Sequence, residues 1–135
     1  MRNDFCVFIL SNGRPDNIKT LETLQRSGYT GKWYIVIDDE DKTGNQYKAT
    51  YGDKVLVFSK TKVAQTTDSC DTSTDRRTPL WARNACWDLA KQVNCRFFCQ
   101  LDDDYSWFAY RRIGRKNPAE PPKYSNFKTQ SLDII

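Results

Sequence analysis

The chain has 135 residues and a net charge of +4, and its 39% hydrophobic and 28% charged content suits one folded domain rather than a disordered chain. It contains no histidine, which excludes Ser-His and Cys-His nucleophilic pairs and the usual zinc sites. Any catalysis must therefore use carboxylates, Lys, Arg, Tyr, or a hard metal ion held by oxygen ligands.

The first half of the chain alternates strand and helix signals. The apolar run FCVFIL, residues 5–10, has the length of a buried strand and ends in the turn signal SNGRPDN. Residues 16–28 predict a helix, with Asp16 or Asn17 as its cap and Gly28 at its end. Further strands are predicted at residues 32–38 and 54–59, separated by a polar turn and a short helix at residues 45–52.

The second half continues the pattern after a long polar segment. Residues 60–78 are rich in Thr, Ser and Asp, so we expect a loop there rather than a core element. Residues 78–93 predict a helix, capped by Thr78 and buried along a stripe from Leu80 to Val93. Residues 95–101 predict a fourth strand. Strands that alternate with helices indicate an α/β fold, a mainly parallel sheet flanked by helices.

Polar residues follow every predicted strand. In a parallel sheet these strand ends share one edge, and ligands bind beyond that edge. In chain order the residues are Ser11 and Arg14, Asp38 and Asp39, Ser59 and Lys60, and Asp102 to Asp104. Because they come from distant parts of the chain and converge, we expect one site at this edge.

The acidic triplet is the most informative part of that set. Asp102, Asp103 and Asp104 repel one another, and the repulsion grows with burial. Mn²⁺ and Mg²⁺ prefer oxygen ligands, and Mg²⁺ commonly takes one or two carboxylates plus substrate phosphates. Because alternate residues of an extended segment point the same way, Asp102 and Asp104 can face one cation while Asp103 faces away. The alternative is an acidic turn that binds nothing.

Other residues near these strand ends are candidates for contacts with a ligand. Arg77 precedes the helix at residues 78–93, and its guanidinium fork suits diphosphate oxygens. Arg83 and Asn84, in the first turns of that helix, either orient the acidic turn, contact a nucleotide, or face solvent. Asp39 either accepts a hydrogen bond from a base N–H or caps the following turn, and Arg14 either contacts ligand or only belongs to a tight turn.

A basic stretch follows the triplet. In YRRIGRKNPAEPPKY, residues 110–124, Glu120 is the single acidic residue among five basic ones: Arg111, Arg112, Arg115, Lys116 and Lys123. A local basic face interleaved with aromatic residues predicts a phosphate or nucleic-acid partner, with a solvated loop as the alternative.

These segments together resemble a known family. FCVFILSNGRPDN, YIVIDDED, WARNACWDLA and FFCQLDDDY resemble, in order and spacing, the signatures of family 2-like GT-A glycosyltransferases over roughly residues 5–105. RPDN and LDDDY, with the aromatic and basic stretch, are also similar to bacteriophage glycosyltransferases that modify hypermodified DNA bases. The resemblance implies a Rossmann-like GT-A fold, a nucleotide-sugar donor (a UDP-sugar first of all), Mn²⁺ or Mg²⁺, and DNA as an acceptor bound through the basic stretch.

The resemblance also implies roles for individual residues. By position, Ser11 and Asp39 hold the base, Asp102 lies near the ribose or the metal, and Asp104 is the main metal ligand. Asp103 joins the donor site, as do Arg77 and Arg83. Family members continue beyond the DxD strand with segments that bind the acceptor, and none is recognisable here. We therefore expect residues 1–135 to be a single donor-binding domain, truncated relative to a full enzyme, with another chain as a partner that completes the fold.

Two other functions stay open at this point. The basic stretch also fits a non-catalytic nucleotide- or DNA-binding module. A metal-dependent nucleotidyltransferase shares the carboxylate and phosphate chemistry, but no Gly-rich phosphate loop follows the first strand. For location, the five cysteines form no CxxC pair, so we expect buried free thiols and a reducing cytoplasm. No apolar run approaches the roughly 20 residues that span a bilayer, so no membrane association is expected.

Overall fold

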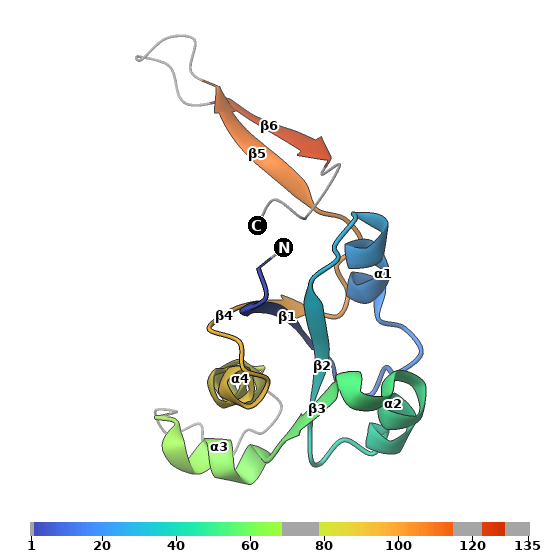
Figure 1. Cartoon of the computed structure of the whole chain (residues 1–135), viewed down its shortest axis with the longest axis vertical. Helices are drawn as coiled ribbons and strands as arrows, with labels where there is room; N and C mark the ends of the chain where they lie inside the picture. The colour runs from blue at the N-terminus through green and yellow to red at the C-terminus, as the bar shows by residue number, and fades with distance from the viewer. Residues whose placement is uncertain (1, 69–78, 115–122, 129–135) are drawn as a thin grey trace.

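The computed structural model describes residues 2–68, 79–114 and 123–128, with side chains for residues 2–68 and 79–109. Four strands form one parallel sheet in the order β3-β2-β1-β4 (Figure 1). They are β1 (Phe5–Leu10), β2 (Lys32–Asp38), β3 (Val55–Phe58) and β4 (Phe97–Asp102). The predicted α/β, Rossmann-like arrangement is confirmed, and the predicted bounds of β1 and β2 match the structure.

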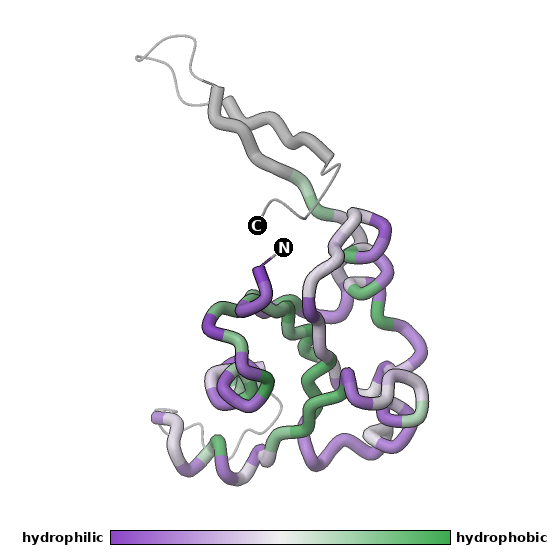
Figure 2. The backbone as a smooth tube through the Cα atoms, in the orientation of Figure 1, coloured by the Kyte–Doolittle hydropathy of each residue, from purple (hydrophilic) through white to green (hydrophobic). Residues whose placement is uncertain are grey.

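Helices cover both faces of the sheet. On one face lie α1 (Lys19–Arg26) and α2 (Gly44–Tyr51), followed by a 3₁₀ turn, η1 (Gly52–Lys54); on the other lie α3 (Lys60–Thr66) and α4 (Leu80–Gln92). Alternate residues of β1 serve the two faces, with Val7 packing on the α1 side and Phe8 on the α4 side. This double burial explains why β1 is continuously apolar, as the colouring of Figure 2 shows along the central strands.

The connections place the carboxyl ends of β1 and β4 together. From β1 the chain runs through α1 to β2 and through α2 to β3, then crosses by α3 and α4 to put β4 on the opposite side of β1. Leu10, the last residue of β1, is in register with Asp102, the last residue of β4. Open α/β sheets bind ligands at the point where the strand order reverses, so this crevice is the expected place for a site.

The start of α1 differs from the prediction. Its N-cap is Ile18, without a side-chain cap, rather than Asp16 or Asn17. The first turn is satisfied by tertiary structure instead, because the backbone N–H of Thr20 donates to the carbonyl of Asp103, 3.1 Å away. The acidic turn after β4 thus replaces a local cap.

The predicted loop at residues 60–78 also differs in part. Residues 60–66 form α3, although, as expected, none of its residues is fully buried. Val63 and Ala64 pack against the core on the α4 side, which is enough to hold a short helix there. Residues 69–78, including the proposed cap Thr78, lie outside the described residues.

The outer edge of the sheet at β4 is exposed. Within the described ranges β4 has a neighbour only on its β1 side, and its residues are exposed or half-buried. Trp87 on α4 is 66% exposed beside it, and Cys99 is exposed, which corrects the expectation that this thiol is buried. Cys6, Cys86 and Cys95 are buried free thiols, as predicted.

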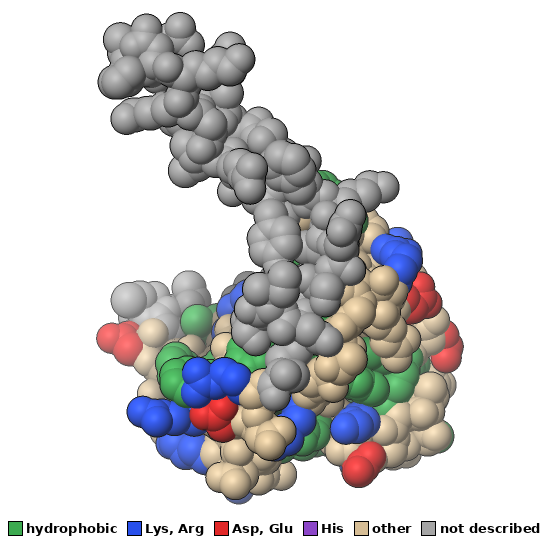
Figure 3. Space-filling model, turned by 45° about the horizontal axis from the view of Figure 1, so that its top comes forward, with side chains coloured by type: hydrophobic (Ala, Val, Ile, Leu, Met, Phe, Trp, Pro, Cys, Tyr) green, Lys and Arg blue, Asp and Glu red, His purple; other side chains and the backbone are tan. Residues whose placement is uncertain are grey.

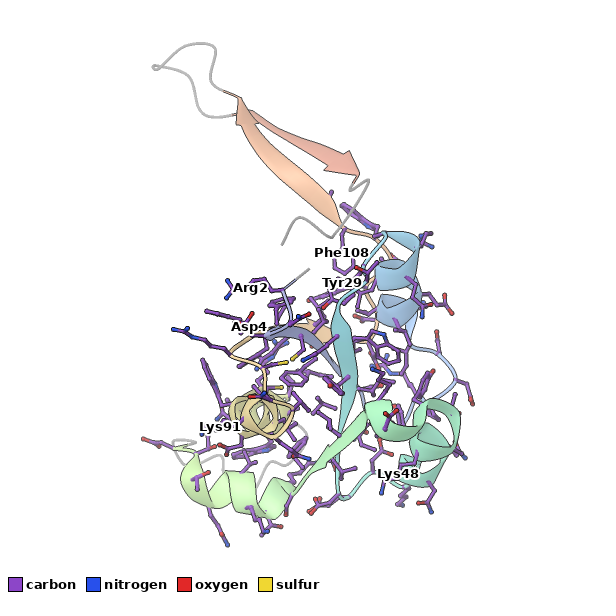
Figure 4. All side chains as sticks on the ribbon, viewed as in Figure 1. Arg2, Asp4, Tyr29, Lys48, Lys91 and Phe108 are labelled. Carbon is purple, nitrogen blue, oxygen red and sulfur yellow. The ribbon has the colours of Figure 1, made fainter. Side chains whose placement is uncertain are left out.

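A separate antiparallel hairpin follows the sheet. It pairs β5 (Ala109–Gly114) with β6 (Lys123–Lys128) and projects from the α/β body in Figure 1. Its base is held against α1, where Arg26 Nη2 donates to the carbonyl of Ser106 over 2.7 Å. Phe108 packs into the α1-side core near Tyr29, as Figure 4 shows.

Candidate functional site

A pocket of about 490 Å³ lies at the carboxyl edge of the sheet, within the size range of small-ligand sites. All four strand ends and the start of α4 contribute to it. Its polar lining consists of Ser11, Asn12, Arg14, Asp38, Lys60, and Asp102 to Asp104. The convergence expected from the strand order is therefore present in the structure.

Asp103 is the buried anchor of this pocket, 1% exposed. Its Oδ2 accepts a hydrogen bond from Ser11 Oγ at 2.5 Å, and its Oδ1 pairs with Arg14 Nη2 at 2.8 Å. Tyr47 extends the network, since its hydroxyl lies 2.7 Å from Ser11 Oγ and accepts from the backbone N–H of Arg14 at 2.9 Å. The loop after β1 is thereby fastened to the acidic turn after β4.

The chemistry of Asp103 fixes which groups donate in this hydrogen-bond network. A carboxylate only accepts, so the Ser11 hydroxyl donates to Asp103 and must receive its own bond from the Tyr47 hydroxyl. Burial raises the pKa of Tyr47, although the hydrogen bond that its oxygen accepts from the Arg14 backbone opposes that rise. Tyr47 therefore stays a neutral phenol that can hold this chain of donors.

Asp102 and Asp104 flank Asp103 in different surroundings. Asp102 Oδ1 pairs with Arg83 Nη2 of α4 at 2.8 Å, and Arg83 is itself held where its carbonyl accepts from Gln100 Nε2 at 2.7 Å. Asp104 is exposed at the rim of the pocket, and no described residue is paired with its carboxylate. The turn thus offers one carboxylate that is already neutralised and one that is available.

Thr20, a fully buried residue of α1, holds the backbone of the acidic turn in place. Its hydroxyl donates to the carbonyl of Asp102 at 2.5 Å and accepts from the backbone N–H of Tyr105 at 2.9 Å. This pair of bonds clamps both ends of the turn, so the three carboxylates start from a rigid backbone.

On the β2 side the pocket contains a buried ion pair. Asp38 Oδ2 lies 3.1 Å from Lys60 Nζ, with side chains 8% and 13% exposed, and it also accepts from Asn12 Nδ2 at 3.0 Å. The other oxygen, Asp38 Oδ1, accepts from the backbone N–H of Glu40 at 3.0 Å. This cluster lies on the pocket wall opposite the acidic turn.

Asp39 has a different place from the one sequence suggests for a base contact. Its Oδ1 accepts the backbone N–H of Lys60 at 3.0 Å, at the start of α3, and it lines a small hollow separate from the main pocket. Burial acts to raise the pKa of Asp39, but the bonds from the Lys60 backbone and the Ser59 hydroxyl lower it overall. In this position it serves the turn and the start of a helix.

The remaining basic and amide residues that sequence suggests as ligand contacts lie away from the main pocket or outside the described residues. Arg83 and Asn84 line a groove of about 600 Å³ between α4 and β4, and Asn84 Nδ2 donates to Thr67 Oγ1 at 3.1 Å. That groove lies beside the strands rather than at their ends, and none of its lining residues is a carboxylate. Arg77, Arg115 and Lys116 lie outside the described residues, whereas Arg111 and Arg112 belong to β5.

The carboxylates of the acidic turn are the residues that could hold a divalent cation. Among the described residues no three Asp, Glu, Cys or His side chains gather closely enough to enclose a metal ion. Asp102 and Asp104 supply two hard carboxylate donors at an open rim, and Mg²⁺ needs only one or two when substrate phosphates complete its shell. A cation held by these two carboxylates would need further oxygen ligands, such as substrate phosphates, to complete its shell.

Sequence predicts no individual role for several residues that line or support the pocket. Asp38 and Lys60, which line it, follow strand ends, and that position is a signal in the sequence. Asn12, which also lines it, and the supporting residues Thr20 and Tyr47 have no such local signal. Tyr47 sits in a helix 36 positions after Ser11, and only the packing of α2 against the β1 loop brings them together.

The fold and the site define an α/β protein with a carboxylate-rimmed pocket at the switch point of its sheet. The model of the TET-Associated Glycosyltransferase family matches residues 5–134, nearly the whole chain. The chain belongs to that family, which implies glycosyltransferase function in general. No curated protein and no solved structure matches the chain. In the described part of the chain, no helix is long and apolar enough to cross a membrane.

Proposed function

We propose that this chain forms the donor site of a metal-dependent glycosyltransferase of the GT-A type that takes a nucleoside-diphosphate sugar, first of all a UDP-sugar. The observation that carries the proposal is the pocket itself. It brings Arg14, Lys60 and the available carboxylate of Asp104 to the switch point of the sheet in a chain of glycosyltransferase ancestry.

In this proposal the base lies against Asp38, Asn12 and Lys60 rather than against Asp39. The N–H of an imide would donate to Asp38, while Asn12 and Lys60 would donate to its carbonyls. Ser11 acts indirectly, because its hydroxyl is already committed to Asp103.

The diphosphate would lie between the two sides of the pocket. Arg14 lines it with a guanidinium that Asp103 holds in place, and Asp102 and Asp104 are the residues that would hold Mn²⁺ or Mg²⁺. When bound, such a cation neutralises charge on the departing diphosphate. In the transfer, the bond between the anomeric carbon and the diphosphate oxygen breaks, a bond to an acceptor hydroxyl oxygen forms, and the hydroxyl proton leaves.

For the acceptor we propose DNA, bound by the β5–β6 hairpin. The hairpin segment carries Arg111 and Arg112 in β5 and continues into Arg115 and Lys116. It begins five residues after Asp104 in the sequence, and a two-stranded ribbon has a width that the major groove admits. Fluorescence anisotropy with duplex DNA should show binding that weakens steeply with salt and is reduced when Arg111 and Arg112 are replaced by Gln.

A second measurement separates the alternative function, because DNA binding alone does not. A non-catalytic DNA-binding module would bind DNA in this way but transfer no sugar from any nucleotide-sugar to it. Mass analysis of DNA incubated with UDP-glucose and Mn²⁺ is the readout for that distinction. DNA binding that does not change with salt would contradict the hairpin as the contact surface.

Calorimetric titration of UDP with Mn²⁺, and again with EDTA, tests the donor site. We expect Mn²⁺-dependent binding that Asp104→Ala abolishes. Asp88→Ala is the matched control, because Asp88 is an exposed carboxylate of α4 far from the pocket lining and paired only with Lys91. UDP that binds equally in Mn²⁺ and EDTA would contradict the metal dependence, and no binding in either would contradict the donor site.

A further inference from the structure

The acidic turn contains two arginine–carboxylate pairs whose carboxylates differ sharply in burial. Arg14, itself 55% exposed, pairs with Asp103, whose side chain is only 2% exposed, and both oxygens of that carboxylate are occupied. Arg83 pairs with Asp102 through one oxygen only, and the two side chains are 40% and 41% exposed. The same turn therefore holds one closed pair and one open pair.

The burial of each carboxylate decides which of the two pairs can separate when another partner binds. Breaking a buried pair leaves an uncompensated charge in the interior, which is strongly unfavourable. An exposed pair contributes little, because water solvates both partners once they separate. Arg14 and Asp103 are thus a fixed unit of the site, whereas Arg83 and Asp102 can separate at small cost when a better partner arrives for either one.

Both better partners belong to the proposed donor complex. A diphosphate carries more negative charge than one carboxylate and presents several oxygens to a guanidinium fork. Asp102, once released, has both oxygens available beside Asp104. Gln100 holds the backbone of Arg83 rather than its guanidinium, so the side chain can turn while α4 stays in place.

We infer that Arg83 is an exchangeable counter-ion: it neutralises Asp102 in the free protein and transfers to the donor's diphosphate on binding, which releases Asp102 for a divalent cation. This inference rests on the proposed function and adds a positioning role for Arg83. It makes the diphosphate and the cation bind with positive coupling, since each one breaks the same Arg83–Asp102 pair.

If Arg83 is exchanged in this way, Asp102→Asn should have opposite effects on UDP affinity in EDTA and in Mn²⁺. With EDTA present, Asp102→Asn should strengthen UDP binding by about fivefold, the affinity equivalent of releasing one exposed pair. With Mn²⁺ present, the same substitution should weaken UDP binding, because it removes a carboxylate ligand. In the Arg83→Gln background the gain in EDTA should disappear, since no arginine remains to be released.

Calorimetry of UDP in EDTA on wild type, Asp102→Asn, Arg83→Gln and the double variant tests this directly. Asp104→Asn is the matched control, because it removes an equal charge from the same turn without freeing an arginine, so its effect should be the same with and without Arg83. A gain from Asp102→Asn that persists in the Arg83→Gln background would overturn the exchange and leave only a general effect of charge.

A second titration uses Mn²⁺ alone. Arg83→Gln should bind Mn²⁺ about fivefold more tightly than wild type without nucleotide, because Asp102 starts free. An unchanged Mn²⁺ affinity would overturn the inference while leaving the donor site intact. Absence of UDP binding in wild type with Mn²⁺ would instead reject the proposed function itself.

Discussion

At the scale of single residues, three neighbouring carboxylates have three different surroundings. Asp103 is inside the protein and bonded to Ser11 and Arg14, Asp102 is half-exposed and paired with Arg83, and Asp104 is at the rim. Arginines on two other elements offset much of the mutual repulsion. The triplet is therefore stable in the free protein while Asp104 remains available.

Asp103 and Asp104 should respond very differently to the same substitution. Asp103→Asn removes the charged acceptor of the buried hydrogen bond from Ser11 and the partner of the exposed Arg14 guanidinium, so the free energy of unfolding in urea should fall by about 2 kcal/mol. Asp104→Asn, one residue away and exposed, should change it by less than about 0.5 kcal/mol. Equal effects of the two substitutions would contradict the structural role of Asp103.

Asp41 predicts a pH dependence of stability. Its carboxylate accepts from the hydroxyl and backbone N–H of Thr43 and from the backbone N–H of Gly13, and although burial acts to raise the pKa of Asp41, these bonds lower it below the ordinary 3.8. A folded pKa below the unfolded one stabilises the fold fully above about pH 4, and that stabilisation is lost as pH falls through the folded value.

The comparison that tests this is wild type against Asp41→Asn. At pH 7 the variant should be less stable by about 1 kcal/mol, because a charge-accepting carboxylate has become an amide. Below pH 4 the two unfolding free energies should converge. A constant difference from pH 7 down to pH 3 would show that the Asp41 charge does not matter.

At the scale of elements, the site depends on a contact between α1 and the turn after β4. Thr20 is the contact, because its hydroxyl and backbone N–H together bond Asp102, Asp103 and Tyr105. The helix gains its first-turn partner and the turn gains rigidity from the same residue. Neither element has this geometry in isolation.

Replacing Thr20 by the isosteric Val tests that coupling. Two backbone groups of the turn lose their partner in a buried place, so thermal unfolding should report a loss of about 2 kcal/mol. Thr23→Val is the matched control: Thr23 is also buried on α1, but its only side-chain bond is a 3.4 Å contact from Arg26. If Thr23→Val destabilised the protein as much, packing rather than the clamp would explain the loss.

Elements with a strong apolar signal could be predicted from the sequence, and elements set by tertiary contacts could not. β1 and β2 are buried runs whose ends are marked by polar residues, so their bounds follow from local pattern. α3 has only Val63 and Ala64 as apolar contacts, too few to make a stripe. The cap of α1 was wrong because Asp103, more than 80 positions away, supplies the partner that Asp16 or Asn17 would have supplied.

For the candidate site, too, one part could be predicted from the sequence and another could not. Its location follows from topology alone, since every parallel strand ends at the same edge and the order reverses beside β1. The pairing of individual side chains does not, because Tyr47 with Ser11 and Arg14 with Asp103 depend on loops that meet only in the folded chain. Sequence alone therefore identified the carboxylates but not their separate surroundings.

At the scale of the whole molecule, the sheet has two outer strands, β3 and β4, and each has a neighbour on one side only among the described residues. Along β4, Trp87, Phe97 and Cys99 are exposed. Unpaired edges favour pairing with another chain, which supports the proposal that a partner chain completes the fold there. On the face shown in Figure 3, Lys and Arg side chains alternate with Asp and Glu rather than forming a single basic patch.

The central claim is that the pocket at the carboxyl edge of the sheet binds a nucleoside diphosphate. The most direct measurement is amide chemical-shift mapping by NMR on the ¹⁵N-labelled protein, titrated with UDP and Mg²⁺. We expect shifts at Asn12, Gly13, Lys60 and Asp102 to Asp104, with none at Trp87 and Phe97 in the groove between α4 and β4. Shifts that gather in that groove, or no shifts at all, would contradict it.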